Sequence, residues 1–333
     1  MYQPEGYAVA LFFMVASMIC WGSWANTIKL APGWRFQLFY WDYVGGILLA
    51  SLAWGLTLGS IDDGPHRLAH DLAQAAPASV VSALAAGAIF NVANLLLVAA
   101  IELAGLAVAF PIGIGLALVV GVLLNYTLAP RGNPMLLFGG VGLVALAIVL
   151  DALAYRRKEV LHPALSARAI GVCLGCGVLM GLFYPFVTRA STGPGALGPY
   201  AVALVFAVGV LLCAIPVNYL FMRRPLTAGG PLDMRAYFAG RPRWHVAGIA
   251  GGVIWCTGTV LNFVAARAAI VGPAISYAIG QGATLVSAVW GVLVWREFRG
   301  APPAARRLLG WMFLCFLAGL TLVAIAPIVG SPR

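Results

Sequence analysis

The sequence predicts an all-α integral membrane protein with ten transmembrane helices, arranged as two inverted five-helix repeats. Its 333 residues are 62% hydrophobic and 9% charged, with a mean hydropathy of +0.96, which is more apolar surface than a water-soluble globule buries. The apolar segments each run to about 20 residues, the length of a membrane-spanning helix. The stretch 109–115 (AFPIGIG) also returns about 167 residues later as 276–282 (SYAIGQG).

Ten apolar segments are long enough to cross a bilayer, and no soluble domain fits between them. The expected spans are 7–29, 36–58, 78–101, 105–127, 134–154, 167–189, 198–220, 245–267, 271–295 and 307–328. The first segment has no basic residue before it and no small-residue cleavage site after it, so we expect it to stay in the mature protein. Pro111 and Pro185 fall inside spans four and six and are expected to kink them.

The repeated stretch predicts a chain built from two copies of one unit. The glycine pairs that align at an offset of 167 are Gly105 with Gly272, Gly113 with Gly280 and Gly115 with Gly282. Five spans per copy give a first repeat over residues 1–165 and a second over 166–333 within one membrane domain. An odd number of spans makes the copies insert in opposite directions, so the repeats are expected to be inverted. Because Ile114 aligns with Gln281, we expect solute recognition around the more polar second copy.

The basic residues predict the orientation of the chain. Although the net charge is +10, every Lys and Arg lies in or beside a short loop, so we expect contact with the lipid bilayer and none with nucleic acid. The loops that follow spans one, three, five, seven and nine carry 15 of these residues, and the opposite face carries 5. The richer face is expected to be cytoplasmic. Both termini would then lie outside, in the periplasm if the protein is in a bacterial inner (plasma) membrane.

Neither catalysis nor a bound cofactor is expected. The chain has no HExxH sequence, no nucleophile elbow and no intramembrane carboxylate pair at catalytic spacing. All six cysteines fall within predicted spans and all four histidines in loops, so neither a metal site nor a disulfide framework is predicted. We expect a monomer, because two repeats already complete the fold.

Asp42 is the clearest ionisable residue inside a predicted span. An Asp at a helix centre costs about 2.5–3.5 kcal/mol unless something compensates its charge. Three compensations are open: a proton, an ion pair with Lys29 across the first loop, or hydrogen bonds from neighbouring Tyr and Trp side chains. A proton would make Asp42 the proton-coupling candidate of a transport cycle, whereas an ion pair would make it structural.

Uncharged polar and aromatic residues inside the spans are the candidate solute contacts, because a polar group in hydrocarbon needs a partner or a water-filled cavity. Amides and hydroxyls beside Trp and Tyr rings suit a neutral, hydrogen-bonding solute. For each residue taken singly, a hydrogen bond between helices is the alternative. The predicted substrate-binding residues are Trp24, Asn26, Asn91, Asn94, Tyr184, Trp255, Thr259, Asn262, Tyr277, Gln281 and Thr284.

Several runs of sequence resemble a known group of transporters. Ten spans, the run 20–24 (CWGSW) and glycine-rich fourth and ninth spans resemble the drug/metabolite transporter superfamily, most closely its branch of plant ureide permeases and bacterial glucose, ribose and rhamnose porters. The runs 39–43 (FYWDY), 90–94 (FNVAN) and 105–108 (GLAV) are similar to the opening of ureide permeases. The resemblance implies secondary active, proton-coupled uptake and makes Asp42 the leading coupling carboxyl. The short central loop departs from the plant permeases, so their substrates are not carried over.

We therefore predict a secondary active transporter that imports a small neutral polar solute, either a sugar or a ureide-like or nucleobase-like compound, by proton symport. The solute would bind near the membrane midplane, between residues of spans one, three, four, six, eight and nine. The alternative is an exporter of drugs or amphipathic metabolites, whose cavity would be larger, more apolar and lined by carboxylates or aromatic rings. A non-transporting scaffold or receptor would not need a two-copy architecture.

Overall fold

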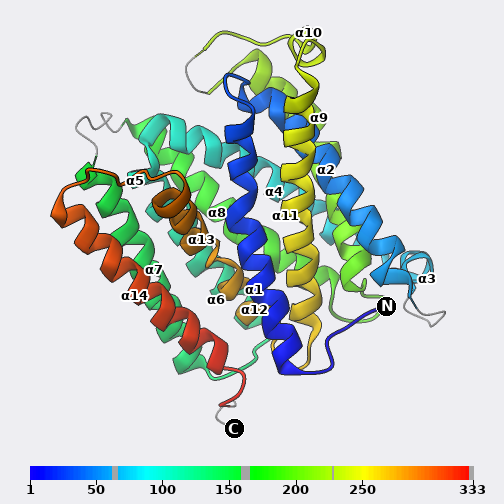
Figure 1. The fold of residues 1–333 in the computed structure, drawn as a ribbon. Helices are drawn as coiled ribbons and strands as arrows, with labels where there is room; N and C mark the ends of the chain where they lie inside the picture. Colours follow the sequence, from blue (N-terminus) through cyan, green and yellow to red (C-terminus); the bar gives the residue numbers. More distant parts are fainter. Residues whose placement is uncertain (62–66, 159–165, 227–228, 330–333) are drawn as a thin grey trace.

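The protein is a bundle of membrane-spanning helices (Figure 1). The computed structural model describes residues 1–61, 67–158, 166–226 and 229–329. In these ranges, ten helical segments are long and apolar enough to cross a membrane. All ten overlap the predicted spans, and their ends differ from the predicted ends by at most six residues, at the start of the fourth span. The predicted boundary between the two units, at 165 and 166, adjoins residues outside the described part.

The elements follow one another in chain order with short connections. They are α1 (Tyr7–Ser23), the 3₁₀ helix η1 (Trp24–Leu30), α2 (Phe36–Leu56), η2 (Leu58–Ser60), α3 (Leu68–Gln74), α4 (Pro77–Ala104), α5 (Leu106–Ala109), the π-helical η3 (Phe110–Gly115), α6 (Leu116–Leu128), α7 (Pro134–Lys158), α8 (Ala167–Ala190), α9 (Pro199–Arg223), α10 (Met234–Phe238), α11 (Pro242–Arg267), α12 (Pro273–Gly280), α13 (Ala283–Val289), the π-helical η4 (Trp290–Val294) and α14 (Pro303–Ile325).

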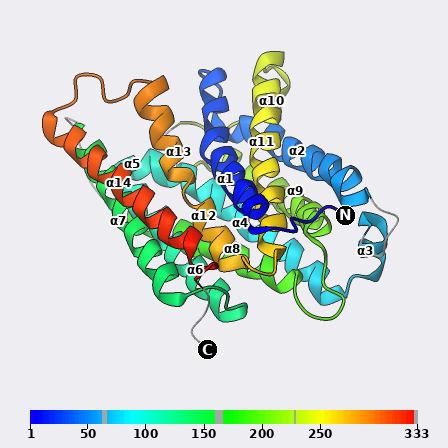
Figure 2. The same ribbon diagram turned by 60° about the horizontal axis from the view of Figure 1, so that its bottom comes forward.

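The main contacts between helices have counterparts in which every span is replaced by the corresponding span of the other five. α2 packs on α11 as α9 packs on α4, and α1 packs on α11 as α8 packs on α4. α7 and α14 pack on each other and form one edge of the bundle, while α2 and α3 lie at the opposite edge (Figures 1 and 2). This pairing is consistent with the predicted inverted units.

Facing glycines let three of these helix pairs approach until their backbones touch. The pairs are Gly46 and Gly252 between α2 and α11, Gly87 and Gly209 between α4 and α9, and Gly140 and Gly319 between α7 and α14. A side chain added at any of the six would overlap backbone atoms of the opposite helix. Small residues at such crossings are how membrane helices gain packing contacts, because burial against lipid supplies little driving force.

The repeated stretch has the same backbone conformation at its start in both copies. Gly105 has φ 73° and ψ 163°, and Gly272 has φ 76° and ψ 168°, a region that favours glycine. Beyond these caps the two spans differ. Span four contains η3, whose π-helical turn includes Pro111, and this is the irregularity expected where proline removes a backbone donor. Span nine stops at the end of α12 and restarts at α13, so Gln281 lies in a break.

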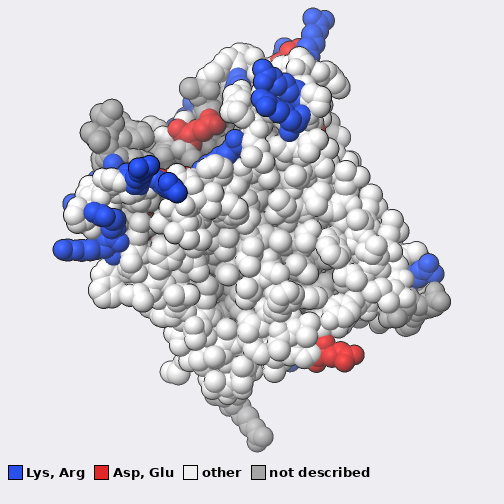
Figure 3. Space-filling view, in the orientation of Figure 1, with Lys and Arg blue, Asp and Glu red and all other residues white. Residues whose placement is uncertain are grey.

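The connections that follow the odd-numbered spans lie on one side of the bundle, as the topology requires. Figure 3 shows Lys and Arg side chains gathered along this side, at the top of the view, with few charged residues at the bottom. The side carries α10 and the connection from η4 to α14 (Figure 1). We call it the basic face. α1 begins and α14 ends on the opposite face (Figure 1).

Substitution of one crossing glycine should destabilise the bundle. Gly46→Ala would push α2 away from α11, and overpacking of this kind costs about 1–3 kcal/mol. Gly45→Ala is the matched control on the same helix, since no other atom lies within 4 Å of the position that its Cβ would take. Melting curves of the purified variants in detergent measure the difference. Equal melting temperatures for the two variants would contradict the close crossing.

Candidate functional site

A cavity of about 620 Å³ lies between the two predicted units. Its walls come from α1 and η1, α4, η3, α8, α11 and the break between α12 and α13. At the basic face it is bordered by Trp34, Arg35 and Glu102, which we call the mouth. Its deepest described walls include Phe183 and Trp255. These are the spans that the sequence predicted around a solute.

Aromatic rings form much of the cavity wall. Trp21 and Trp255 lie nearly parallel, with ring centroids 6.2 Å apart and an interplanar angle of 15°. Phe90 stacks on the same Trp255 ring at 4.2 Å. The indole Nε1 of Trp21 donates to Thr259 Oγ1 at 3.0 Å, which fixes the ring against α11. Gly280 leaves room for this ring, because a Cβ there would lie 2.6 Å from Trp21. The wall therefore offers fixed planes on which a flat or apolar solute face can stack.

Uncharged polar groups break the apolar wall at a few points. Asn94 of α4 borders the cavity but is 2% exposed, and its buried Nδ2 lies beside the hydroxyls of Tyr40 and Tyr43 without a well-formed hydrogen bond to either. Gln281 lies at the break of span nine, where it and Thr284 also border the cavity. A buried amide whose hydrogen bonds are incomplete costs free energy. The cavity thus combines amide side chains with stacking surfaces, which fits a solute with both a flat face and hydrogen-bonding groups.

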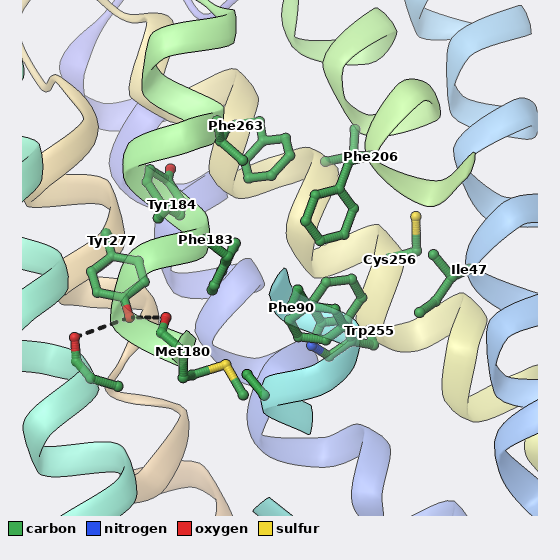
Figure 4. Close-up of a cluster of buried hydrophobic side chains, with 14 of the residues drawn as sticks. Ile47, Phe90, Met180, Phe183, Tyr184, Phe206, Trp255, Cys256, Phe263 and Tyr277 are labelled. Carbon is green, nitrogen blue, oxygen red and sulfur yellow. Dashed lines mark hydrogen bonds between the residues drawn. The ribbon is translucent and has the colours of Figure 1, made fainter. Parts of the chain in front are cut away.

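A layer of aromatic side chains lies between this cavity and a second pocket on the opposite face. We call the layer the aromatic barrier, and it consists of Phe90, Phe183, Tyr184, Phe206, Trp255, Phe263 and Tyr277 (Figure 4). Phe183 borders the cavity, whereas the next residue, Tyr184, borders the second pocket. That pocket measures about 260 Å³ and is also lined by Arg131 and Arg267.

Hydrogen bonds fix the tyrosines of the barrier. The Tyr277 hydroxyl donates to the backbone oxygens of Ala117 at 3.3 Å and Met180 at 3.1 Å, which ties span nine to spans four and six (Figure 4). The Tyr184 hydroxyl donates to Asn262 Oδ1 at 2.6 Å, and Asn262 Nδ2 donates to the Ser276 carbonyl at 3.0 Å. The barrier is therefore a bonded structure that must rearrange before the two sides can connect.

The predicted solute contacts fall into two groups. Those around the cavity are Trp24, Asn94, Trp255, Gln281 and Thr284. Those in the barrier or behind the cavity wall, each with a hydrogen bond to another protein group, are Asn26, Asn91, Tyr184, Thr259, Asn262 and Tyr277. The residues of the second group bond other protein groups, as the alternative interpretation of hydrogen bonds between helices expected.

Asp42 does not border the cavity, and the suggested ion pair with Lys29 is wrong. The Asp42 carboxylate accepts from the Tyr237 hydroxyl at 2.7 Å and from His245 Nδ1 at 2.9 Å. Lys29 instead pairs with Glu297 at 2.9 Å, because η1 ends beside the connection to α14. The third option, hydrogen bonds from other side chains, is present, although the partners are distant in sequence rather than neighbours; a proton on Asp42 stays a prediction.

Glu297 ties three elements together on the basic face. It accepts from Tyr155 at the end of α7 at 2.6 Å and from Lys29 at 2.9 Å. Burial raises the pKa of Glu297, but these two hydrogen bonds and the charges of Lys29 and Lys158 outweigh burial and hold that pKa below its ordinary value. Because its pKa is lowered in the folded protein, the ionised Glu297 carboxyl stabilises the fold at pH values above its ordinary pKa. This stabilisation is lost as the pH falls through the lowered pKa.

Sequence reasoning missed Trp21, Phe90 and Phe183 in the cavity wall and Tyr237 and His245 beside Asp42. A helical spacing of three puts Trp21 on the same face as Trp24, so the pattern was available. Nothing local marks the other four, because their roles depend on which helices pack together.

A ten-span helical bundle, whose cavity reaches one face and is closed from the other by a barrier, defines a multi-pass membrane transporter rather than an enzyme. The sequence profile of the ureide permease family matches residues 39–164 and 169–326. The chain therefore belongs to the ureide permease family.

Individual relatives agree with this membership. Ureide permease 4 and ureide permease 1 of Arabidopsis thaliana are each 24% identical to this chain. The alignments cover 97% of this chain and 98% of the former, and 99% of both chains for the latter. A solved structure described only as the crystal structure of a protein has the same fold, with a TM-score of 0.63 and 14% identity over 95% of this chain and 98% of its own. The predicted resemblance to ureide permeases is thus confirmed.

Cysteine labelling should distinguish the cavity from the barrier. In a background without the six native cysteines, Thr284→Cys should react with a water-soluble maleimide, because Thr284 borders the cavity. Ser276→Cys should not react in the folded protein, because Ser276, which belongs to α12, is fully buried against α11. Reaction is measured as a mass shift before and after denaturation. Equal labelling of both positions in the folded protein would contradict the geometry.

Proposed function

We propose that the protein is a secondary active transporter that imports a ureide-type small neutral solute by proton symport. We place it in a bacterial inner (plasma) membrane as a monomer, with the basic face in the cytoplasm and both termini in the periplasm. The family's wider kinship with the drug/metabolite transporter superfamily and its sugar porters belongs to the same proposal. The two predicted units, residues 1–165 and 166–333, would rock against each other about the site.

The amides of the cavity support a neutral, hydrogen-bonding solute, whereas its aromatic wall is also the lining expected of the drug-exporter alternative. A ureide carries carbonyl and N–H groups on a small, compact frame, and the cavity presents amides and hydroxyls between aromatic planes. The observation that carries the proposal is that two amide side chains, Asn94 and Gln281, border a cavity whose wall is otherwise largely aromatic and apolar. The two charged residues at the mouth, Arg35 and Glu102, have opposite signs, so the entrance has no net charge to favour an ion. The relatives' names, ureide permeases, point to the same solute class.

Proton coupling is proposed for Asp42. It is 6% exposed and lies in a membrane-spanning helix, where a carboxyl is costly unless it serves the transport cycle or is well bonded. The carboxyl also lies one layer away from the cavity, because Tyr237 and His245 contact Trp34 of the mouth. A change of charge at Asp42 can therefore act on the cavity entrance through Tyr237, His245 and Trp34.

Removal of the Asn94 amide should weaken solute binding. Asn94→Leu keeps the side-chain size but loses a hydrogen bond worth about 0.5–1.5 kcal/mol, so the Kd should rise about twofold to tenfold. Thermal-shift titration with allantoin, uracil, xanthine and glucose first identifies the ligand, and titration calorimetry then gives the Kd. Thr321→Val, a polar-to-apolar change on the exposed face of α14, is the control. Stabilisation by lipophilic cations alone would sink the proposal and favour a drug exporter.

The coupling role of Asp42 has its own test. In proteoliposomes, Asp42→Asn should keep solute counterflow, which needs no net proton movement, and lose accumulation driven by an inward proton gradient. Asp233→Asn is the matched control, since Asp233 is an exposed carboxyl at the start of α10 on the same face. Full gradient-driven accumulation by Asp42→Asn would show that the proton binds elsewhere.

A further inference from the structure

A second titratable side chain is bonded directly to the buried carboxyl of α2. Asp42 Oδ2 lies 2.9 Å from Nδ1 of His245, which belongs to the first turns of α11, and Oδ1 accepts from Tyr237 of α10 at 2.7 Å. Gly248 makes this approach possible, because a Cβ at that position would lie 2.5 Å from the Asp42 Cβ. Two neighbouring elements, α10 and α11, thus meet the distant α2 at one carboxyl.

Among the described residues, Tyr237 and His245 are the titratable groups bonded to Asp42. Burial, together with the hydrogen bond to Asp42 and the charge of Asp42, raises the pKa of Tyr237, so its hydroxyl stays protonated and acts only as a donor. The nearby cations are occupied or exposed: Arg241 lies over the Trp244 ring at 5.2 Å, and Arg243 is exposed. Imidazole is the side chain that ordinarily exchanges protons near neutral pH. His245 is therefore the group able to pass a proton to or from Asp42.

The histidine also connects the carboxyl to water. The side chain of Asp42 is 6% exposed, whereas that of His245 is 24% exposed. The second ring nitrogen, Nε2, packs against Gly240, where a Cβ would lie 2.7 Å away. The exposed part of the His245 ring lets it exchange a proton with water at the basic face while the Nδ1 proton passes to the carboxylate.

The same ring contacts the mouth of the cavity. The indole of Trp34 meets His245 edge to face, with centroids 4.8 Å apart and an interplanar angle of 75°. Trp34 borders the cavity and also packs against Tyr237 and Trp244. Movement of the His245 ring would therefore displace Trp34 at the cavity entrance.

We propose that Asp42 and His245 form one proton-carrying pair, in which His245 relays the proton between water and Asp42 and links its charge to the position of Trp34. The inference rests on the proposed proton symport and deepens it. When a proton binds Nε2 of the neutral imidazole and the Nδ1 proton passes to Oδ2, the imidazole is neutral again and the carboxyl becomes neutral. The His245–Asp42 contact then loses its charge-assisted bond, and α10 with Trp34 is free to shift.

His245→Asn separates the relay from a structural role. The Asn amide can still donate to Asp42 Oδ2 but cannot exchange protons, so counterflow should stay within about threefold of wild type while gradient-driven accumulation falls at least tenfold. Uptake should also depend less steeply on pH than in wild type. His70→Asn, on the exposed α3, is the matched control and should behave as wild type. Full accumulation with an unchanged pH profile in His245→Asn would overturn the pair while leaving Asp42 as the coupling group.

A second variant covers the case in which His245→Asn does not fold, as judged from its melting curve. Tyr237→Phe leaves both members of the pair and removes one donor to the carboxylate, so coupling should persist with the midpoint of the pH profile moved to higher pH. An unmoved midpoint would contradict the pair. Wild-type protein that fails to respond to a proton gradient would overturn proton symport itself, and the pair with it, which distinguishes that failure from the failure of His245 alone.

Discussion

Direct backbone contact between helices is the constraint on which the rest of the structure depends. Six glycines, in three facing pairs, remove the side chains that would hold α2 from α11, α4 from α9 and α7 from α14. α4 and α11 are each held between two neighbours, since α4 also packs on α8 and α11 on α1. These two helices carry Asn94 and Trp255 to the wall of the cavity. The close crossings thus fix the positions of two helices that line the cavity.

The cavity is chemically less symmetric than the fold. Both copies of the repeated stretch start at a glycine with positive φ, but the first continues through a π-helical turn and places Ile114 at the cavity, whereas the second breaks and places Gln281 there. Irregular backbone within a membrane is tolerated where it is buried in protein or lines a cavity. Phe183 and Tyr184, adjacent in α8, face the cavity and the opposite pocket respectively, so a modest shift of this helix would alter access on both sides.

Hydropathy and length were enough to predict the ten spans, because each helix must cross the same apolar thickness. The repeated glycines also predicted matching starts for spans four and nine, and Gly105 and Gly272 have matching backbone angles. The partner of Asp42 was not predictable in this way. Lys29 was the nearest cation in sequence, but η1 carries it to Glu297, while the connection after α9 folds back and brings Tyr237 to Asp42. His245 lies at the start of the eighth span, and only the packing of that span on the second shows that it meets Asp42.

A structure determined with bound solute tests the central claim most directly. The account predicts the solute in the cavity against the aromatic wall that includes Trp24 and Trp255, with its polar groups near the amides of Asn94 and Gln281. Solute bound only in the pocket beside Arg131 and Arg267, with the cavity on the basic face unfilled, would contradict it.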